Sequence, residues 1–240
     1  MEREVSRYPQ LNIERFEAIN GKDIGFQFST LTPGALGCLL SHFEIIRKSI
    51  NESLDILIIE DDIVLMPNIF QVEEIIQSLN ASRCNWDILY LDGTIVQMDV
   101  AENLHSKMVS SPKKQFVAEV EQHWTIFGTH AYVINRSSKI KVLEFIGQKL
   151  WQGRPIDNIY VAGNCLGALK SYLCVPYMTA PSALSLNSEI TQNANSDQRI
   201  YIWDSIRRHL ANVVQEEPLS KFTSRHRLLF GGTKFSHFIK

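Results

Sequence analysis

The most constraining feature of the chain is a short apolar run that ends abruptly in three acids. Ile56–Ile59 is unbroken, and Glu60, Asp61 and Asp62 follow it directly. An aliphatic run this short is typical of a strand buried on both faces. Ligands in open α/β sheets collect beyond the carboxyl ends of strands, where these acids would fall. The stretch therefore indicates either a site for a hard cation such as Mg²⁺ or Mn²⁺, or an acidic turn that is simply solvated.

The composition is that of a globular protein with a sizeable core. Hydrophobic residues make up 45% and charged residues 21% of the 240 residues. The net charge of −2 gives no indication of nucleic-acid binding. The four cysteines form no C-x-x-C pair, which argues against a zinc site or a disulfide framework and fits a reducing compartment. With no apolar run of roughly 18 residues and no signal peptide, we expect a cytoplasmic protein.

Strand-like and helix-like segments alternate along the chain, which predicts an α/β fold with a mostly parallel sheet flanked by helices. We expect residues 86–91 to form a strand parallel to the first. Residues 97–120 are polar and irregular, which favours a binding loop or flap. The other expected strands are 125–135 and 171–175, and the expected helices are 33–51, 69–79, 137–147, a stretch from about 157 and one near 200–210.

Two polar residues on predicted helices allow two interpretations each. His42 would share a helical face with Ala35, Cys38 and Ile45, so it is either a core histidine bonded to a backbone carbonyl or a group turned into an active site. Asp157 lies near a helix N-terminus, where it either caps the helix or supplies a reactive carboxylate.

The C-terminal part differs from the rest in charge. We expect a single domain over residues 1–215 and a basic tail over 216–240, because no acid follows Glu217 while lysines, arginines and aromatic residues do. Such a tail either lies on an anionic membrane, which would make the protein peripheral on the inner face, or is merely solvated.

Six blocks of sequence resemble glycosyltransferase family 25, which includes bacterial lipooligosaccharide galactosyltransferases and collagen hydroxylysine galactosyltransferases. Their order is more specific than any single block, and the resemblance covers roughly residues 14–200. The blocks are Ala18-Ile-Asn-Gly21, Thr32-Pro-Gly34-x-x-Gly37-Cys38-x-x-Ser41-His42, Ile58-Ile-Glu60-Asp61-Asp62, Trp86-Asp-Ile-Leu-Tyr90, Gly128-Thr129-x-Ala-Tyr132-Val-Ile134 and Pro155-Ile-Asp157.

This resemblance implies a GT-A-like (Rossmann-like) fold and an inverting hexosyltransferase. The implied donor is a nucleotide sugar, UDP-galactose or UDP-glucose, used with Mn²⁺ or Mg²⁺. The implied acceptor is a glycan or glycolipid such as lipooligosaccharide or lipopolysaccharide.

The resemblance also assigns roles to individual residues. Glu60-Asp61-Asp62 stands where the family has its D-x-D-like motif, so Asp62 is the expected metal ligand, Asp61 the second candidate, and Glu60 a donor-binding group. Inversion in one step needs a base near the attacking hydroxyl. Asp157 is the candidate for that base and Asp197 the alternative. The residues expected to line the donor pocket are Gly37, Ser41 and His42.

The chain departs from the family pattern in two places. The usual first strand has no counterpart before Ala18, so we expect the sheet to lack it, which would either remove a strand from the sheet interior or expose an edge. Ala35 stands where the family often has Glu. These departures keep open a catalytically inactive member that acts as a binding or scaffold protein. A third hypothesis is an unrelated metal-dependent phosphohydrolase. The P-loop and G-x-G-x-x-G patterns are absent, which argues against an ATPase or dehydrogenase.

Overall fold

The computed structural model describes most of the chain between Ser6 and Ala211. The described residues are 6–9, 11, 13–24, 31–82, 84–111, 115–182, 198–211, 219 and 221. Asp197 and nearly all of the basic tail 216–240 lie outside these residues, so the predicted tail, its membrane contact and the domain boundary stay predictions. No helix within the described ranges is both long and apolar enough to cross a membrane.

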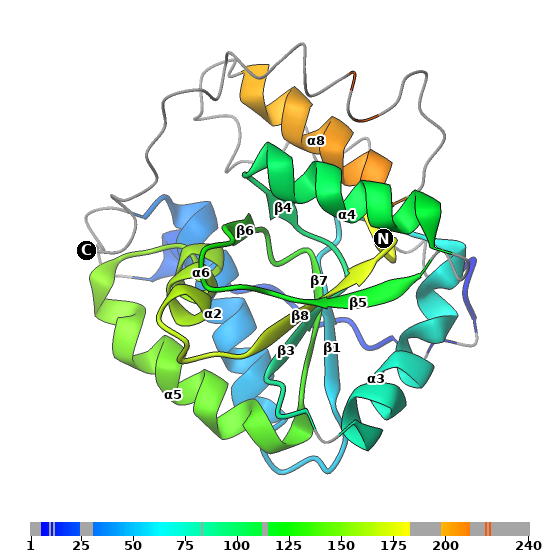
Figure 1. The fold of residues 1–240 in the computed structure, drawn as a ribbon. Coiled ribbons are helices and arrows are strands. Elements are labelled where there is room, and N and C mark those ends of the chain that lie inside the picture. Colours follow the sequence, from blue (N-terminus) through cyan, green and yellow to red (C-terminus); the bar gives the residue numbers. More distant parts are fainter. Residues whose placement is uncertain are drawn as a thin grey trace.

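A five-stranded sheet forms the centre of the fold, with the strands in the order β1–β7–β3–β8–β5 (Figure 1). Their bounds are Ile56–Ile59 (β1), Ala131–Ile134 (β7), Ile88–Tyr90 (β3), Ser171–Val175 (β8) and Phe116–Glu119 (β5). Two short ribbons accompany the sheet. They pair β2 (Ile63–Leu65) with β9 (Thr179–Pro181), and β4 (Thr94–Ile95) with β6 (Ile126–Phe127).

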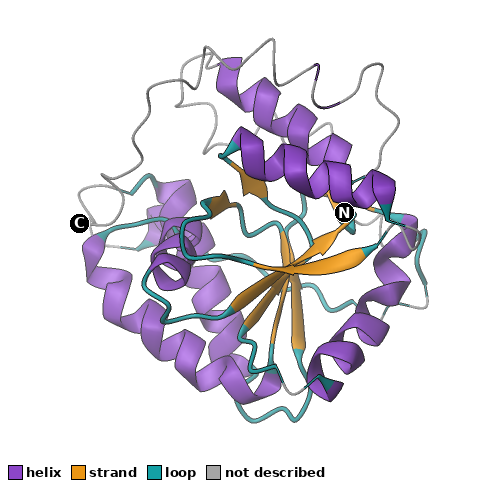
Figure 2. Cartoon of the chain, viewed as in Figure 1, coloured by secondary structure: helices purple, strands orange, loops and turns teal. Residues whose placement is uncertain are grey.

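Helices surround the sheet on both faces, as Figure 2 shows. The α-helices are α2 (Pro33–Lys48), α3 (Val72–Ala81), α4 (Met98–Ser110), α5 (Lys139–Lys149), α6 (Ile156–Cys165) and α8 (Gln198–Leu210). The short 3₁₀ helices are η1 (Gly21–Asp23), η2 (Pro67–Gln71), η3 (Arg136–Ser138) and η4 (Leu150–Gln152).

Side chains alternate between the two faces of the sheet and build two cores. On one face, Ile58, Tyr90 and Tyr132 belong to a cluster that includes residues of α2, α5 and α6. On the other face, Leu89 and Val133 belong to a cluster with residues of α3 and β2. Both faces are thus covered, and the predicted α/β class is confirmed.

The predicted mostly parallel pairing is wrong. Within the described residues, β3–β8 is the parallel pair of this sheet, while β1–β7, β7–β3 and β5–β8 are antiparallel. The physical reason is the placement of β7, which returns between β1 and β3 and pairs with both. β1 and β3 do point in the same direction, as expected, but they are not neighbours. The sequence predicted the common direction of β1 and β3, but it did not predict that β7 would lie between them.

The prediction of an irregular loop over 97–120 is also wrong, because α4 and β5 occupy most of this segment. Ala101, Leu104 and Met108 are buried, which is the spacing of one helical face. The many polar residues of the exposed face concealed that pattern. The helix predicted from Pro33 is confirmed, with the Thr32 side chain accepting a hydrogen bond from the Ala35 N–H at 3.2 Å.

β1 is an edge strand of the sheet in the described part of the chain. Leu57 at its centre is 37% exposed. Glu60 donates its N–H to the His130 carbonyl at 2.7 Å, so the pairing with the β7 side continues past the last strand residue. This extension fixes the position of the first acid of the triplet.

Candidate active site

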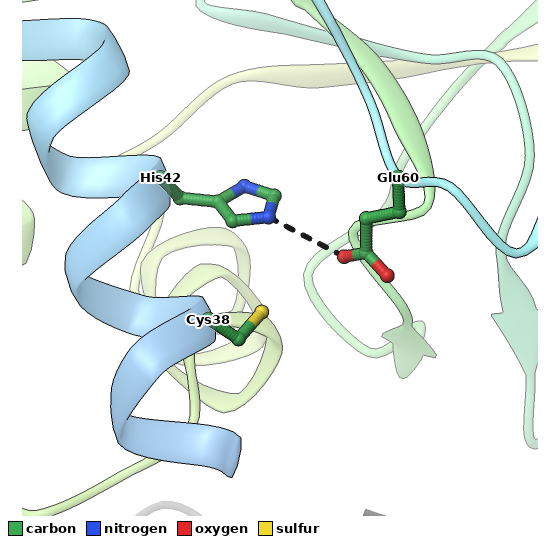
Figure 3. A group of neighbouring side chains, drawn as sticks. All are labelled: Cys38, His42 and Glu60. Atoms are coloured by element: carbon green, nitrogen blue, oxygen red, sulfur yellow. Dashed lines mark ion pairs between the residues drawn. The ribbon is translucent and has the colours of Figure 1, made fainter. Parts of the chain in front are cut away.

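Functional side chains from three parts of the chain converge beyond the end of β1. Glu60 follows β1, and Thr129 comes from the loop that leads into the paired strand β7. Thr129 donates its hydroxyl to Glu60 Oε1 at 2.7 Å. Cys38 and His42 come from α2, four residues apart and therefore on one helical face. Figure 3 shows both of these side chains directed from the helix toward Glu60.

His42 is buried, but side chains rather than a backbone carbonyl are its partners. Its Nε2 lies 3.4 Å from Glu60 Oε1, and its Nδ1 lies 2.7 Å from the Tyr132 hydroxyl. The Tyr132 hydroxyl in turn accepts a hydrogen bond from Tyr160 at 3.2 Å. The imidazole is therefore held between a tyrosine pair and a carboxylate. The prediction that a core His42 would bond to a backbone carbonyl is therefore wrong. The ring instead lies beside Glu60, the first residue of the acid triplet.

The carboxyl group of Glu60 is strongly biased toward its charged form. Burial opposes ionisation, but the hydrogen bond from His42, the charges of His130 and His42, and the hydrogen bond from Thr129 outweigh it. Together they lower the pKa of Glu60 to about 2. Glu60 is thus a fixed negative charge at the end of β1.

Asp62 lies in the opposite electrostatic situation. Burial, and then the charge of Glu60, raise the pKa of its carboxyl group, against smaller opposing effects of His130 and Arg207. Its Oδ1 atom is buried and has no hydrogen-bond partner among the described residues. Asp61 beside it is exposed. A buried carboxylate oxygen without a partner fits a bound divalent cation, because such an ion would supply the missing contact.

Asp157 lies in the first turn of α6, two positions after the N-cap Pro155. Its Oδ1 accepts the Asn158 N–H at 2.7 Å, and its carboxylate also accepts the Gly128 N–H. Burial raises the pKa of Asp157, and the charge of Glu60 adds to this, so the two carboxylates lie close enough to interact. Asp157 therefore accepts one N–H of the helix terminus and one N–H of the loop before β7, and its carboxylate is influenced by the charge of Glu60.

Gly37 and Ser41 make contacts away from the acids. Ser41 Oγ accepts the Ile19 N–H at 2.8 Å and donates to the Gly37 carbonyl at 2.7 Å. A Cβ added to Gly37 would lie 2.4 Å from the Ile19 carbonyl oxygen, and one added to Gly21 would lie 2.0 Å from the Pro33 carbonyl oxygen. These small residues let the segment 19–21 lie against α2. A donor contact of Gly37 or Ser41 stays a prediction.

Several neighbours of the acids were not predicted from the sequence: Cys38, Thr129, His130, Tyr132 and the pair Asp92–Arg207. Arg207 of α8 binds Asp92 through two hydrogen bonds of 3.0 and 2.6 Å, and both side chains are buried. His130 Nδ1 lies 3.7 Å from Asp92 Oδ1. Thr129 and Tyr132 could have been identified from the family-like block of sequence that contains them. No sequence pattern indicated the partners of Asp92, which are distant from it in the chain.

The fold and the acid cluster together define an α/β protein whose candidate ligand site lies at the end of a strand, the edge of the sheet where ligands of open α/β proteins collect. The model of the family "Glycosyltransferase family 25 (LPS biosynthesis protein)" matches residues 1–160, which is 160 of 240 residues. The chain therefore belongs to glycosyltransferase family 25.

Three relatives are similar to parts of the chain. The "Probable inactive glycosyltransferase 25 family member 3" of Bos taurus is 28% identical over 130 residues, covering 53% of this chain and 20% of its own length. "Procollagen galactosyltransferase 1" of Danio rerio is 27% identical over 157 residues, covering 61% and 24%. The "Inactive glycosyltransferase 25 family member 3" of Homo sapiens is 34% identical over 64 residues, covering 26% and 11%. The matches thus span a quarter or less of these relatives.

Proposed function

We propose that this chain is a metal-dependent, inverting hexosyltransferase that moves galactose from UDP-galactose to a glycan or glycolipid acceptor. The observation that carries the proposal is the buried Asp62 Oδ1 beside the charged Glu60, an atom with no hydrogen-bond partner among the residues that the structure describes. The family membership and the galactosyltransferase among the relatives support the choice of reaction. The family description names lipopolysaccharide biosynthesis, which favours a lipopolysaccharide-type acceptor.

The acids would divide the work between the donor and the acceptor. Asp62, with Asp61 as the exposed second acid, would hold Mn²⁺ or Mg²⁺. The cation, when bound, stabilises the negative charge that develops on the departing diphosphate. Glu60, kept charged by His42 and Thr129, would orient the donor or the metal shell.

Asp157 would act as the base that removes a proton from the attacking hydroxyl of the acceptor. A carboxyl group with a raised pKa is a stronger base once ionised, and direct inversion requires such a base. Asp197, outside the described residues, remains the alternative for this role.

Calorimetric titration of UDP and UDP-galactose, with and without Mn²⁺, tests the donor site. We expect nucleotide binding that requires Mn²⁺ and weakens at least about tenfold in Asp62→Asn, because the variant loses a charged metal ligand. Glu74→Gln, which removes an exposed acid of α3, is the matched control and should bind as the wild type does. Absence of nucleotide binding by the wild type under every condition would refute the proposal.

A transfer assay separates the enzyme from its non-enzymatic alternative. UDP release from UDP-galactose with a lipooligosaccharide acceptor should occur with the wild type and be lost in Asp157→Asn, while UDP binding persists. The two relatives named as inactive favour a second candidate, a binding or scaffold protein. Tight Mn²⁺-dependent binding of UDP-galactose without turnover on any glycan acceptor would support that candidate.

A further inference from the structure

A second group of metal ligands lies beside the acid triplet and differs from it in chemistry. Cys38, His42 and Glu60 offer a thiol sulfur, an imidazole nitrogen and a carboxylate oxygen, and these three atoms all lie within 4.8 Å of one another. Figure 3 shows the three side chains directed to a common point between α2 and the end of β1. Thiolate and imidazole ligands favour Zn²⁺, whereas carboxylates alone favour Mg²⁺ or Mn²⁺.

The geometry of this group suits a tetrahedral ion. Two ligands bound at about 2.0–2.2 Å to a tetrahedral Zn²⁺ lie about 3.4 Å apart. His42 Nε2 and Glu60 Oε1 are separated by 3.4 Å, which is longer than a charge-assisted hydrogen bond of about 2.7–2.9 Å. A thiolate at about 2.3 Å from the ion would lie roughly 3.6 Å from the other two atoms. The Cys38 sulfur lies within 4.8 Å of both atoms, so its separations exceed this value by no more than about 1.2 Å.

The surroundings hold the ligands in the orientation that an ion requires. The Tyr132 hydroxyl at 2.7 Å from Nδ1 of His42 can accept the Nδ1 proton, which leaves Nε2 free to bind the ion. Metal-bound histidines usually have a partner of this kind on the other ring nitrogen. Thr129 holds the Glu60 carboxylate at 2.7 Å. The ligands are thus positioned by contacts that lie outside the group itself.

We propose that Cys38, His42 and Glu60 bind a Zn²⁺-like cation, at a site separate from the Asp61–Asp62 site proposed for Mn²⁺. On binding, the Cys38 S–H bond breaks and the sulfur–metal bond forms. His42 binds as the neutral imidazole with its proton on Nδ1, so a proton on Nε2 is displaced as well, and the displaced protons pass to solvent. The thiolate and the Glu60 carboxylate then balance the two charges of the ion. The fourth position stays open to water.

Occupation of this site has one consequence that rests on the proposed function. Glu60 is a ligand of the proposed zinc site, and under the proposed function it also orients the donor, so a Zn²⁺ ion on Cys38 and His42 would withdraw Glu60 from the donor. Zn²⁺ would therefore compete with nucleotide-sugar binding rather than replace Mn²⁺.

Titration with Co²⁺, a spectroscopic substitute for Zn²⁺, tests the site without any donor or acceptor. We expect sulfur-to-cobalt charge-transfer absorption with an equimolar end point, reversed by added Zn²⁺. The absorption should disappear in Cys38→Ser and persist in Cys84→Ser and Cys165→Ser, which alter two other free cysteines. A wild-type protein without this absorption, or absorption that survives in Cys38→Ser, would overturn the proposal.

Two further variants, Glu60→Gln and Asp62→Asn, allow the cobalt titration to be interpreted if Cys38→Ser does not fold. Glu60→Gln leaves every cysteine in place and should weaken Co²⁺ binding at least about tenfold, so it replaces Cys38→Ser if that variant does not fold. Unchanged affinity in Glu60→Gln contradicts the three-ligand site. Asp62→Asn should keep the cobalt absorption while it loses Mn²⁺-dependent UDP binding. This pattern distinguishes a failure of the zinc site from a failure of the proposed function.

Discussion

Two carboxyl groups that are only two residues apart, Glu60 and Asp62, have pKa values shifted in opposite directions. Glu60 accepts hydrogen bonds and lies near two histidines, which stabilises its charge. Asp62 is half-buried beside the negative charge of Glu60, and its Oδ1 has no partner within the part of the chain that the structure describes. The two residues should therefore contribute with opposite signs to the stability of the metal-free protein.

Glu60 should stabilise the fold at neutral pH. Its folded-state pKa of about 2 lies below its ordinary value of 4.5, so the contribution is present above pH 4.5 and is lost as the pH falls toward 2. Glu60→Gln should lower the free energy of unfolding at pH 7 by about 1–3 kcal/mol, after allowance for the 26% exposure of the side chain. Urea unfolding at pH 7 and pH 3 measures this. An equal loss at both pH values would contradict the expected linkage.

Asp62→Asn should stabilise the metal-free protein at neutral pH. The raised pKa means that the folded state binds the proton more tightly, so stability is highest below the ordinary pKa of 3.8 and falls as the pH rises through the folded-state value. The gain at pH 7 should be about 0.5–2 kcal/mol, the usual range for a single stabilising substitution. Urea unfolding without metal at pH 7 and pH 3 tests it. Asp61→Asn is the exposed control, and an equal gain there would contradict the role of burial.

The acid triplet, His42 and Asp157 could be singled out from the sequence because each is unusual in its local pattern. Acids directly after an apolar strand and a histidine on an apolar helical face are visible within a few residues. Cys38 shares that face, yet its importance depends on Glu60, which reaches it only through the packing of α2 against the sheet. The absence of a C-x-x-C pair argues only against a zinc site formed by cysteines close in sequence. It does not exclude a site whose ligands come from two elements, such as α2 and the end of β1.

At the scale of the elements, Gly128 connects β6 to β7 and has a positive φ of 91°. A Cβ there would lie 2.2 Å from Cε1 of His130, and the Gly128 N–H bonds to Asp157. Gly128→Ala should therefore lower the free energy of unfolding by more than about 1 kcal/mol and weaken UDP binding. Urea unfolding and calorimetry measure the two effects.

Gly147 provides the matched control for that substitution. It lies within α5, and an added Cβ would meet only Cε2 of Phe43 at 3.9 Å, which is ordinary contact. Gly147→Ala should raise the free energy of unfolding by about 0.5–1 kcal/mol, because alanine favours the helix. Equal changes in the free energy of unfolding at the two glycines would show that the backbone conformation at Gly128 does not require glycine.

Local patterns predicted β1, α2 and β8 because each is a continuous or periodic apolar stretch. They did not predict α4, where the polar face dominates the composition. They also did not predict the position of β7. That position is decided by which edges are available once the sheet assembles, and strands far apart in sequence compete for them.

At the scale of the whole molecule, the pairing of β1 makes a prediction for hydrogen exchange. Glu60 bonds to His130, so Ile58 and Ile56 also point their N–H groups toward β7, and Leu57 and Ile59 point theirs to the outer edge. The amides of Leu57 and Ile59 should exchange much faster than those of Ile58 and Glu60, as measured by NMR. Uniform protection along β1 would mean that another strand covers this edge.

Because β1 lies at the edge of the sheet, a further strand could be added there without affecting the acids at its carboxyl end. The functional acids follow the carboxyl end of the strand, while the free N–H and C=O groups point sideways. A strand added beside Leu57 would widen the sheet without moving Glu60, because the hydrogen bond to His130 holds Glu60 from the opposite side. The architecture is thus modular at this edge, and members of such a family can differ in strand number here while they keep one arrangement of acids.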